Sequence, residues 1–169
     1  STDTPIDTTY TYFASKRGSG YTTTKLKSET INGEKYEYKY DAHSNITDVT
    51  KDGVLQYHYG YDMMNQLVSV DDKLNGKVYN YTYDAGGNLI SETVTDSNGT
   101  TSNAYEYNNS NWGDVLTSYN GQSITYDEIG NPLTYRDGMS MTWKNGRQLA
   151  TLTNGDTSIS YGYDSDSVR

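Results

Sequence analysis

A short tyrosine-aspartate element recurs along the chain and limits its fold more than any other feature. Four copies read Tyr-x-Tyr-Asp and begin at Tyr38, Tyr59, Tyr81 and Tyr161. Variant copies begin at Tyr105, Ile124 and Met141, and residues 10–13 resemble a degenerate first copy. Successive copies lie about 17–24 residues apart, close to the periods of solenoid-type arrays. The chain is therefore predicted to be a series of similar small units.

Each copy has the pattern of a β-strand. Tyr57, Tyr59 and Tyr61 alternate with polar or small residues, and tyrosines also occupy every second position around the copies that begin at Tyr38 and Tyr81. Because side chains alternate between the two faces of a strand, period two places the rings on one face and the polar residues on the other. The predicted tyrosine ladder, with a structural role, comprises Tyr38, Tyr40, Tyr59, Tyr61, Tyr81, Tyr83, Tyr161 and Tyr163.

A turn is expected directly after each of these strands. Asp accepts hydrogen bonds from backbone N–H groups two or three residues later, and the following Gly or Asn tolerates positive φ. An apolar residue such as Leu89 then begins the returning strand. We interpret the recurring aspartates as turn caps, because catalysis needs one unique pair and calcium binding needs a fuller ligand pattern. These aspartates are Asp41, Asp62, Asp84, Asp127 and Asp164.

A second turn signal falls between successive copies. Asn-Gly and Asp-Gly pairs are strong hairpin signals because type I′ turns need positive φ at both central residues. Two turns per repeat imply two strands per repeat, and the whole chain becomes one long antiparallel meander. The pairs begin at Asn32, Asp52, Asn75, Asn98, Asn120, Asp137 and Asn154.

Composition excludes several classes of function. The net charge of −9 disfavours nucleic-acid and anionic-lipid partners, and the chain has no cysteine for a disulfide or thiolate site. No segment has the length and apolarity of a membrane span, so membrane insertion is not expected. The apolar fraction is 33%, and 19 tyrosines stand against one phenylalanine. Such a chain suits thin sheets with much exposed surface, because tyrosine pairs an apolar ring with a wettable hydroxyl.

No catalytic or cofactor motif is present, and the chain is predicted not to be an enzyme. His43 falls in a turn and His58 on a polar face, so both are interpreted as exposed histidines rather than metal ligands. The acidic pairs Asp71-Asp72 and Asp164-Ser-Asp166 come nearest to cation sites, and neither completes a calcium-loop pattern. No metal or cofactor is therefore expected.

The repeated element resembles the Rhs/YD-repeat family. The closest copy is Tyr81-Thr-Tyr83-Asp84-Ala-Gly-Gly87-Asn88-Leu89, and the copy beginning at Ile124 is similar but carries Pro132 before its apolar residue. The stretch from Trp143 to Leu149 is similar to a variant found in bacterial members. The resemblance covers residues 36–169, about seven repeats, better than residues 1–35, which are interpreted as a degenerate N-terminal repeat or cap.

The resemblance implies a spiralling β-sheet that closes into a hollow shell in long members. In bacterial polymorphic toxins and insecticidal toxin complexes this shell encloses a C-terminal toxin, and teneurins carry a similar barrel in an adhesion receptor. Seven repeats are too few to close a shell. The predicted fold class is therefore all-β: an open, curved or spiralling antiparallel meander of β-hairpin repeats, forming part of such a shell.

The resulting functional prediction is a non-catalytic structural segment of a bacterial surface or secreted protein. It would present or enclose a flanking effector domain, with flanking repeats of the parent chain as partners and the secretion signal outside this fragment. Unpaired sheet edges also predict edge-to-edge self-association. The alternative is a module that binds carbohydrate or another cell-surface ligand through aromatic stacking, with Trp112 and Trp143 as the candidate stacking residues.

Overall fold

The computed structural model describes residues 6–15 and 21–164, and these residues are almost entirely β-structure. The described residues contain no α-helix; one short 3₁₀ segment, η1 (Arg136–Gly138), interrupts the strands. None of the described residues forms a helix long and apolar enough to cross a membrane. The chain divides into two compact units, residues 1–82 with 92–102 and residues 83–91 with 103–169.

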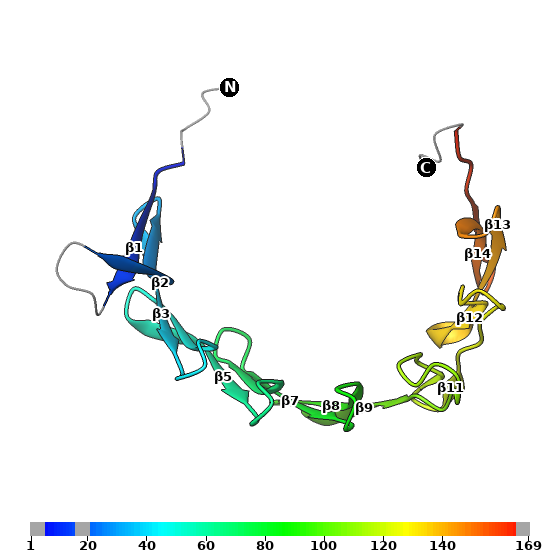
Figure 1. Ribbon diagram of the computed structural model, residues 1–169, viewed down its shortest axis with the longest axis horizontal. Helices are drawn as coiled ribbons and strands as arrows, with labels where there is room; N and C mark the ends of the chain where they lie inside the picture. Colours follow the sequence, from blue (N-terminus) through cyan, green and yellow to red (C-terminus); the bar gives the residue numbers. More distant parts are fainter. Residues whose placement is uncertain (1–5, 16–20, 165–169) are drawn as a thin grey trace. The chain divides into compact units, whose positions relative to one another are not determined.

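Within each sheet, neighbouring strands are hydrogen-bonded in the order in which they occur in the sequence (Figure 1). An eleven-stranded order runs from β1 to β11, and a four-stranded sheet runs from β12 to β15. The early strands are β1 (Thr8–Ala14), β2 (Thr22–Ile31), β3 (Glu34–Tyr40), β4 (Ile46–Lys51), β5 (Val54–Tyr61), β6 (Leu67–Asp72), β7 (Lys77–Tyr83), β8 (Leu89–Asp96) and β9 (Gly99–Glu106). The later ones are β10 (Ser118–Tyr119), β11 (Gln122–Ser123), β12 (Thr134–Tyr135), β13 (Met139–Lys144), β14 (Gln148–Asn154) and β15 (Thr157–Ser160).

The described pairings between these strands are antiparallel, and the predicted all-β meander is confirmed. Each repeat contributes one strand that ends in the tyrosine-aspartate element and one strand that returns. In the first unit, for example, His58 of β5 lies opposite Asp48 of β4 and Asp71 of β6. Short turns can connect such strands directly, because antiparallel strands need only a hairpin between them.

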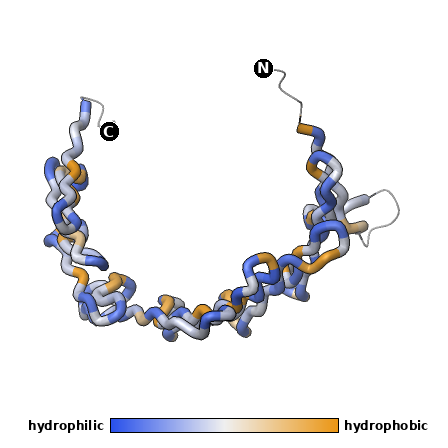
Figure 2. Tube along the Cα trace, turned by 180° about the vertical axis from the view of Figure 1, so that it is seen from behind, coloured by the Kyte–Doolittle hydropathy of each residue, from blue (hydrophilic) through white to orange (hydrophobic). Residues whose placement is uncertain are grey.

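The sheet has almost no apolar core. Ile124, at 3% exposure, is the one buried apolar side chain among the described residues, while five polar side chains are buried. Along the tube in Figure 2, segments of apolar residues are short and are separated by polar residues. In β7 the side chains alternate between half-buried Tyr79, Tyr81 and Tyr83 and exposed residues between them. Stability must therefore depend largely on backbone ladders and cross-strand side-chain pairs.

The Asn-Gly and Asp-Gly pairs do not all occupy the same place in a turn. Asn32-Gly33, Asp52-Gly53 and Asn120-Gly121 connect adjacent strands with positive φ at both residues, as a type I′ turn requires. Asp137-Gly138 also has positive φ at both positions but lies in η1.

For the remaining three pairs the prediction of a type I′ turn centred on the pair is wrong. Asn75 lies within a four-residue turn, and Asn98 follows Ser97 in the turn that precedes β9. Asn154 is the last residue of β14 and pairs with Thr157, so the turn is centred one residue later. None of the three asparagines has positive φ. Strand register, rather than the dipeptide alone, determines which residues occupy the centre of the turn.

Candidate functional site

In four repeats, those of Asp41, Asp62, Asp84 and Asp127, the aspartate side chain closes the turn that follows the strand. At Asp84, Oδ1 accepts hydrogen bonds from the backbone N–H groups of Gly86 (2.8 Å) and Asn88 (2.9 Å). Oδ2 accepts a bond of 2.9 Å from the Asn88 side-chain amide, and the Asp84 N–H donates to the Asn88 carbonyl at 3.0 Å. Both carboxylate oxygens are therefore engaged inside the turn.

The same geometry recurs at Asp41 and Asp127. Asp41 accepts from the N–H groups of His43 and Asn45, each at 2.9 Å, and Asp127 accepts from those of Ile129 and Asn131. In both turns the asparagine amide also donates to the second carboxylate oxygen. The recurrence supports one structural task for the aspartate in each repeat.

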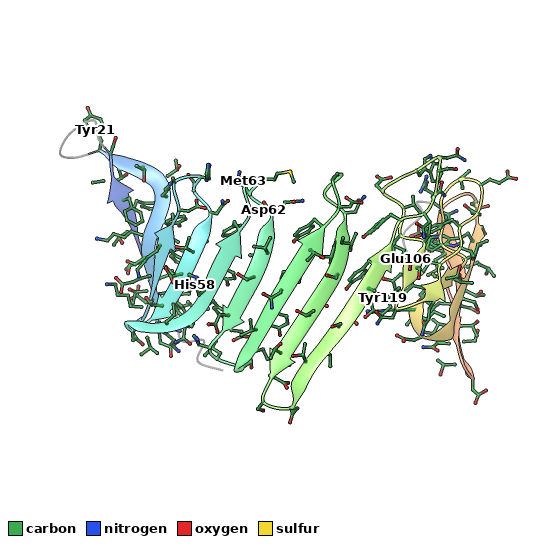
Figure 3. All side chains as sticks on the ribbon, turned by 90° about the horizontal axis from the view of Figure 1, so that it is seen from below. Tyr21, His58, Asp62, Met63, Glu106 and Tyr119 are labelled. Atoms are coloured by element: carbon green, nitrogen blue, oxygen red, sulfur yellow. The ribbon has the colours of Figure 1, made fainter. Side chains whose placement is uncertain are left out.

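Asp62 forms a variant of this turn. Its Oδ1 accepts from the N–H groups of Met64 (2.8 Å) and Gln66 (2.9 Å), but glutamine replaces the asparagine at the fourth position after the aspartate. The Gln66 Oε1 atom is buried without a hydrogen-bond partner. Figure 3 shows Asp62 and Met63 together at one end of their strands, with His58 farther along the sheet.

Hydrogen bonding lowers the pKa of three of these carboxyl groups. At Asp84 the side-chain bond from Asn88 is the largest influence, and backbone donors add to it. At Asp41 and Asp127 the largest single influence is desolvation, which raises the pKa, but the hydrogen bonds together outweigh it and the net pKa is lowered. The three turns therefore favour the charged carboxylate.

The turn asparagines also reach the following turn, a feature that sequence reasoning missed. The Asn45 amide donates to Asn65 Oδ1 at 2.9 Å, and the Asn131 amide donates to the Gly146 carbonyl at 2.7 Å. The Asn88 amide makes a longer contact of 3.3 Å with the Gly113 carbonyl. The recurrence of Asn at the fourth position after Asp was a signal in the sequence that this residue has a structural role. Its bond to the following turn could not be predicted, because that bond depends on how neighbouring turns are placed.

In five repeats the aromatic residue at the third position of the element donates a hydrogen bond to a backbone carbonyl in, or just before, the preceding strand. Tyr61 donates to the Ile46 carbonyl at 2.9 Å, and Tyr126 donates to the Leu116 carbonyl at 2.7 Å. Trp143 replaces a tyrosine, and its Nε1 donates to the Pro132 carbonyl at 2.7 Å. Tyr40 and Tyr163 make the same bond to Leu26 and Leu149, at 2.8 Å and 3.1 Å.

The remaining ladder tyrosines are half-buried. The Tyr38 hydroxyl donates to Glu29 Oε1 at 2.5 Å, and burial, followed by this bond, raises the pKa of Tyr38. Tyr57 and Tyr59 stack with ring centroids 6.0 Å apart, and burial raises the pKa of Tyr59. Tyr81, Tyr83 and Tyr161 are half-buried as well.

The turns at the opposite end of the strands carry a second kind of clamp, also missed from sequence. Asp52 Oδ1 accepts the Lys35 N–H at 2.9 Å, while the Asp52 N–H donates to the Lys35 carbonyl at 2.7 Å. Asn32 makes the same two-point contact with Asp7, and Asn120 makes it with Ala104. The first residue of a type I′ turn therefore binds the adjacent strand as well as shaping its own turn.

The two tryptophans differ in their surroundings. Trp143 is half-buried and held by its indole hydrogen bond. Trp112 is 45% exposed, and a Cβ atom added at Gly130 would lie 2.9 Å from Trp112 Cζ3. Trp112 also lines a small groove of about 200 Å³ with Asn109, Asn111, Asp127 and Glu128.

The described residues hold no cluster of three or more His, Cys, Asp and Glu side chains that could bind a metal. His58 Nδ1 lies 2.9 Å from Asp48 Oδ1 on the polar side of the sheet, whereas the His43 N–H donates within a turn. Asp164 is exposed, and the turn expected after it, together with Asp166, lies outside the described residues.

Comparison with known proteins identifies the repeat. Residues 61–101 match the family model described as RHS Repeat, a region that contains the element at Tyr81. This match confirms the resemblance to the Rhs/YD-repeat family. No curated protein sequence matches the chain.

Solved structures share the fold. Crystal structures of TcdB2-TccC3-TEV, TcdB2-TccC3-Cdc42 and TcdB2-TccC3 are similar over 95% of this chain, each at 17% sequence identity. Their TM-scores are 0.69, 0.66 and 0.65. The chain spans about 10% of the length of each of these structures.

Proposed function

We propose that this chain is a non-catalytic segment of a shell or stalk in a secreted or surface-exposed bacterial Rhs/YD-repeat protein, and that it presents or encloses a flanking effector domain. The repeat family and the fold support the structural part of this proposal. The flanking repeats of the parent chain would be its immediate partners, because the strands of each repeat pair with those of the next.

One observation carries the proposal: the chemical groups that recur in the repeat are used to hold the repeat together. At Asp84 both carboxylate oxygens are engaged by the turn, and the amide of Asn88 is engaged as well. The hydroxyl of Tyr61 is committed to a backbone carbonyl. A carboxylate that accepts several hydrogen bonds and has a lowered pKa is poorly suited to general acid catalysis near neutral pH.

The enclosing role is tested in the full-length protein that carries this segment. Replacing both Asp84 and Asp127 by alanine should open the turns, and the flanking domain should then be cleaved faster in limited proteolysis. Asp114 and Asp156, which are exposed and make no described hydrogen bond, provide the matched double-alanine control. Unchanged cleavage in the turn variant, with the variant shown to be locally opened by hydrogen exchange, would refute enclosure.

A second candidate function, carbohydrate binding, is favoured at Trp112 alone. The residue is 45% exposed and lines a groove with polar neighbours, a combination that suits stacking against a sugar ring. Trp143 is a weaker candidate, because its indole N–H is already bound to Pro132.

Binding is tested by titrating a panel of cell-wall and host oligosaccharides against the chain while following tryptophan fluorescence. A saturable change that is lost in Trp112→Leu but kept in Trp143→Phe supports the second candidate. A panel that produces no saturable change at physiological salt removes it.

A further inference from the structure

We propose that Asn98 and Asn154 are sites of spontaneous deamidation, while the other Asn-Gly pairs are protected by the fold. The sequence contains six such pairs, beginning at Asn32, Asn75, Asn98, Asn120, Asn145 and Asn154. On sequence alone the six are chemically equivalent, because each asparagine precedes a glycine that offers no Cβ to hinder approach. The fold separates them into two classes.

The chemistry needs a mobile asparagine side chain. The backbone nitrogen of the following glycine loses its proton and attacks the side-chain carbon Cγ, forming a five-membered succinimide. The bond from Cγ to Nδ2 breaks, and ammonia leaves after taking up a proton. Water then opens the ring at either carbonyl, giving aspartate or isoaspartate. No oxidant or cofactor is consumed; the net change is that water replaces ammonia.

Two pairs are held by the clamp on the adjacent strand. Asn32 Oδ1 accepts the Asp7 N–H at 3.1 Å, and Asn120 Oδ1 accepts the Ala104 N–H at 2.7 Å. The Asn120 amide also donates to Asn103 Oδ1 at 2.9 Å. Turning Cγ towards the next backbone nitrogen would break these bonds, so the reactive conformation is penalised.

Two further pairs are held by their own turns. The Asn75 amide donates to Asp72 Oδ2 at 2.8 Å, and the Asn75 N–H donates to Asp72 Oδ1 at 3.0 Å. The Asn145 amide donates to Gln148 Oε1 at 2.9 Å. Four of the six side chains are therefore restrained.

Asn98 and Asn154 lack this restraint because they occupy other positions. Asn98 is the second residue of its turn, and its backbone N–H, rather than its side chain, bonds to Asp96 at 2.7 Å. Asn154 ends β14 and pairs with Thr157. Both residues are exposed, and neither side chain makes a hydrogen bond in the described structure. Each is free to rotate towards its glycine.

Conversion would alter both hairpins. Aspartate at position 98 adds a negative charge two residues from Asp96, and isoaspartate inserts an extra methylene into the backbone between β8 and β9. Strand register depends on turn length, so the isoaspartate product should loosen pairing beside the turn. Deamidation would therefore be a slow, irreversible change confined to two turns. Strand register determines which two turns these are, because it sets the position of each asparagine in its turn.

The test is peptide mapping by mass spectrometry after incubation of the 169-residue chain at mildly alkaline pH. Asn98 and Asn154 should deamidate faster than Asn32 and Asn120 by about fivefold or more, the factor expected from one net hydrogen bond. The same incubation in denaturant supplies the reference, because all six pairs should then react at similar rates. Gln148→Ala releases Asn145 and should bring its native rate towards that of Asn98.

Two results would overturn the proposal. In the first, Asn32 or Asn120 reacts as fast as Asn98 in the folded chain. In the second, Asn98 and Asn154 are as strongly protected, relative to the denatured chain, as the four restrained residues. The Asn98→Gln variant, which disfavours the five-membered ring, should lose modification at that position while the other sites keep their rates.

Discussion

The hydroxyl of Tyr61 donates a 2.9 Å hydrogen bond to the carbonyl oxygen of Ile46, the residue at which the preceding strand begins. The bond joins the end of one tyrosine-aspartate strand to the start of its hairpin neighbour. Trp143 makes the equivalent bond to Pro132 with an indole nitrogen. The sheet thus keeps a donor at this position even where the aromatic residue changes.

Removing the Tyr61 hydroxyl should weaken the sheet while leaving its ring packing intact. Tyr61→Phe is expected to reduce the free energy of unfolding by about 1 kcal/mol, the net worth of a typical hydrogen bond. The matched control is Tyr10→Phe, since Tyr10 is 55% exposed and its hydroxyl makes no described hydrogen bond. Urea denaturation followed by circular dichroism measures both. Equal effects in the two variants would contradict a specific role for the Tyr61 bond.

Acid should destabilise the turns. The folded-state pKa values of Asp41, Asp84 and Asp127 are lowered, so the stability that they contribute is present above the unfolded pKa, about 3.9. It is lost as pH falls through the lower folded-state pKa. We expect the urea midpoint to decrease below about pH 4, and Asp127→Asn to reduce that decrease.

Asp156 provides the control for the effect of acid, because it is exposed and has no described partner. Asp156→Asn should leave the pH dependence of the urea midpoint as it is in the unaltered chain. A midpoint that does not change between pH 7 and pH 3, or one that changes equally in the two variants, would count against the turn carboxylates as its source.

Gly130 should be more sensitive to substitution than a glycine with the same backbone. Gly130 and Gly33 have φ values of 84° and 87°, so alanine costs about 1–2 kcal/mol of backbone strain at either position. A Cβ at Gly130 would also meet Trp112, whereas a Cβ at Gly33 has nothing within 4 Å. Gly130→Ala should therefore be the more destabilising of the two and should alone change tryptophan fluorescence. Identical stabilities and spectra would refute the packing of Trp112 on this turn.

Asn131 should contribute more to the free energy of unfolding than a typical turn residue does. It is 3% exposed, and its amide bonds both to Asp127 and to the Gly146 carbonyl. Asn131→Ala removes these two hydrogen bonds of a buried side chain, so we expect a loss of about 2 kcal/mol in unfolding free energy. Hydrogen exchange should show that protection falls at both turns. If protection is lost only at residues 127–131, the hydrogen bond from Asn131 to Gly146 does not couple the stabilities of the two turns.

The local parts of the fold could be predicted because they depend on neighbouring residues. Alternation around Tyr81 predicts a strand, and Asp84 followed by Gly87 predicts a turn. The bond from Asn131 to Gly146 could not be predicted, because it joins residues of successive turns whose spacing differs from repeat to repeat. Asn154 was expected inside a type I′ turn, but its pairing with Thr157 moves the turn by one residue. Local turn preference is small beside the pairing of a whole strand.

We propose that the recurring aspartates serve the turns, and equilibrium unfolding of Asp84→Ala beside Asp156→Ala in the 169-residue chain is the decisive test of this role. Both substitutions remove one carboxylate, but only Asp84 accepts hydrogen bonds from its turn. The predicted result is a lower urea midpoint and reduced hydrogen-exchange protection at residues 84–88 for Asp84→Ala alone. Equal midpoints and equal protection in the two variants would contradict the claim.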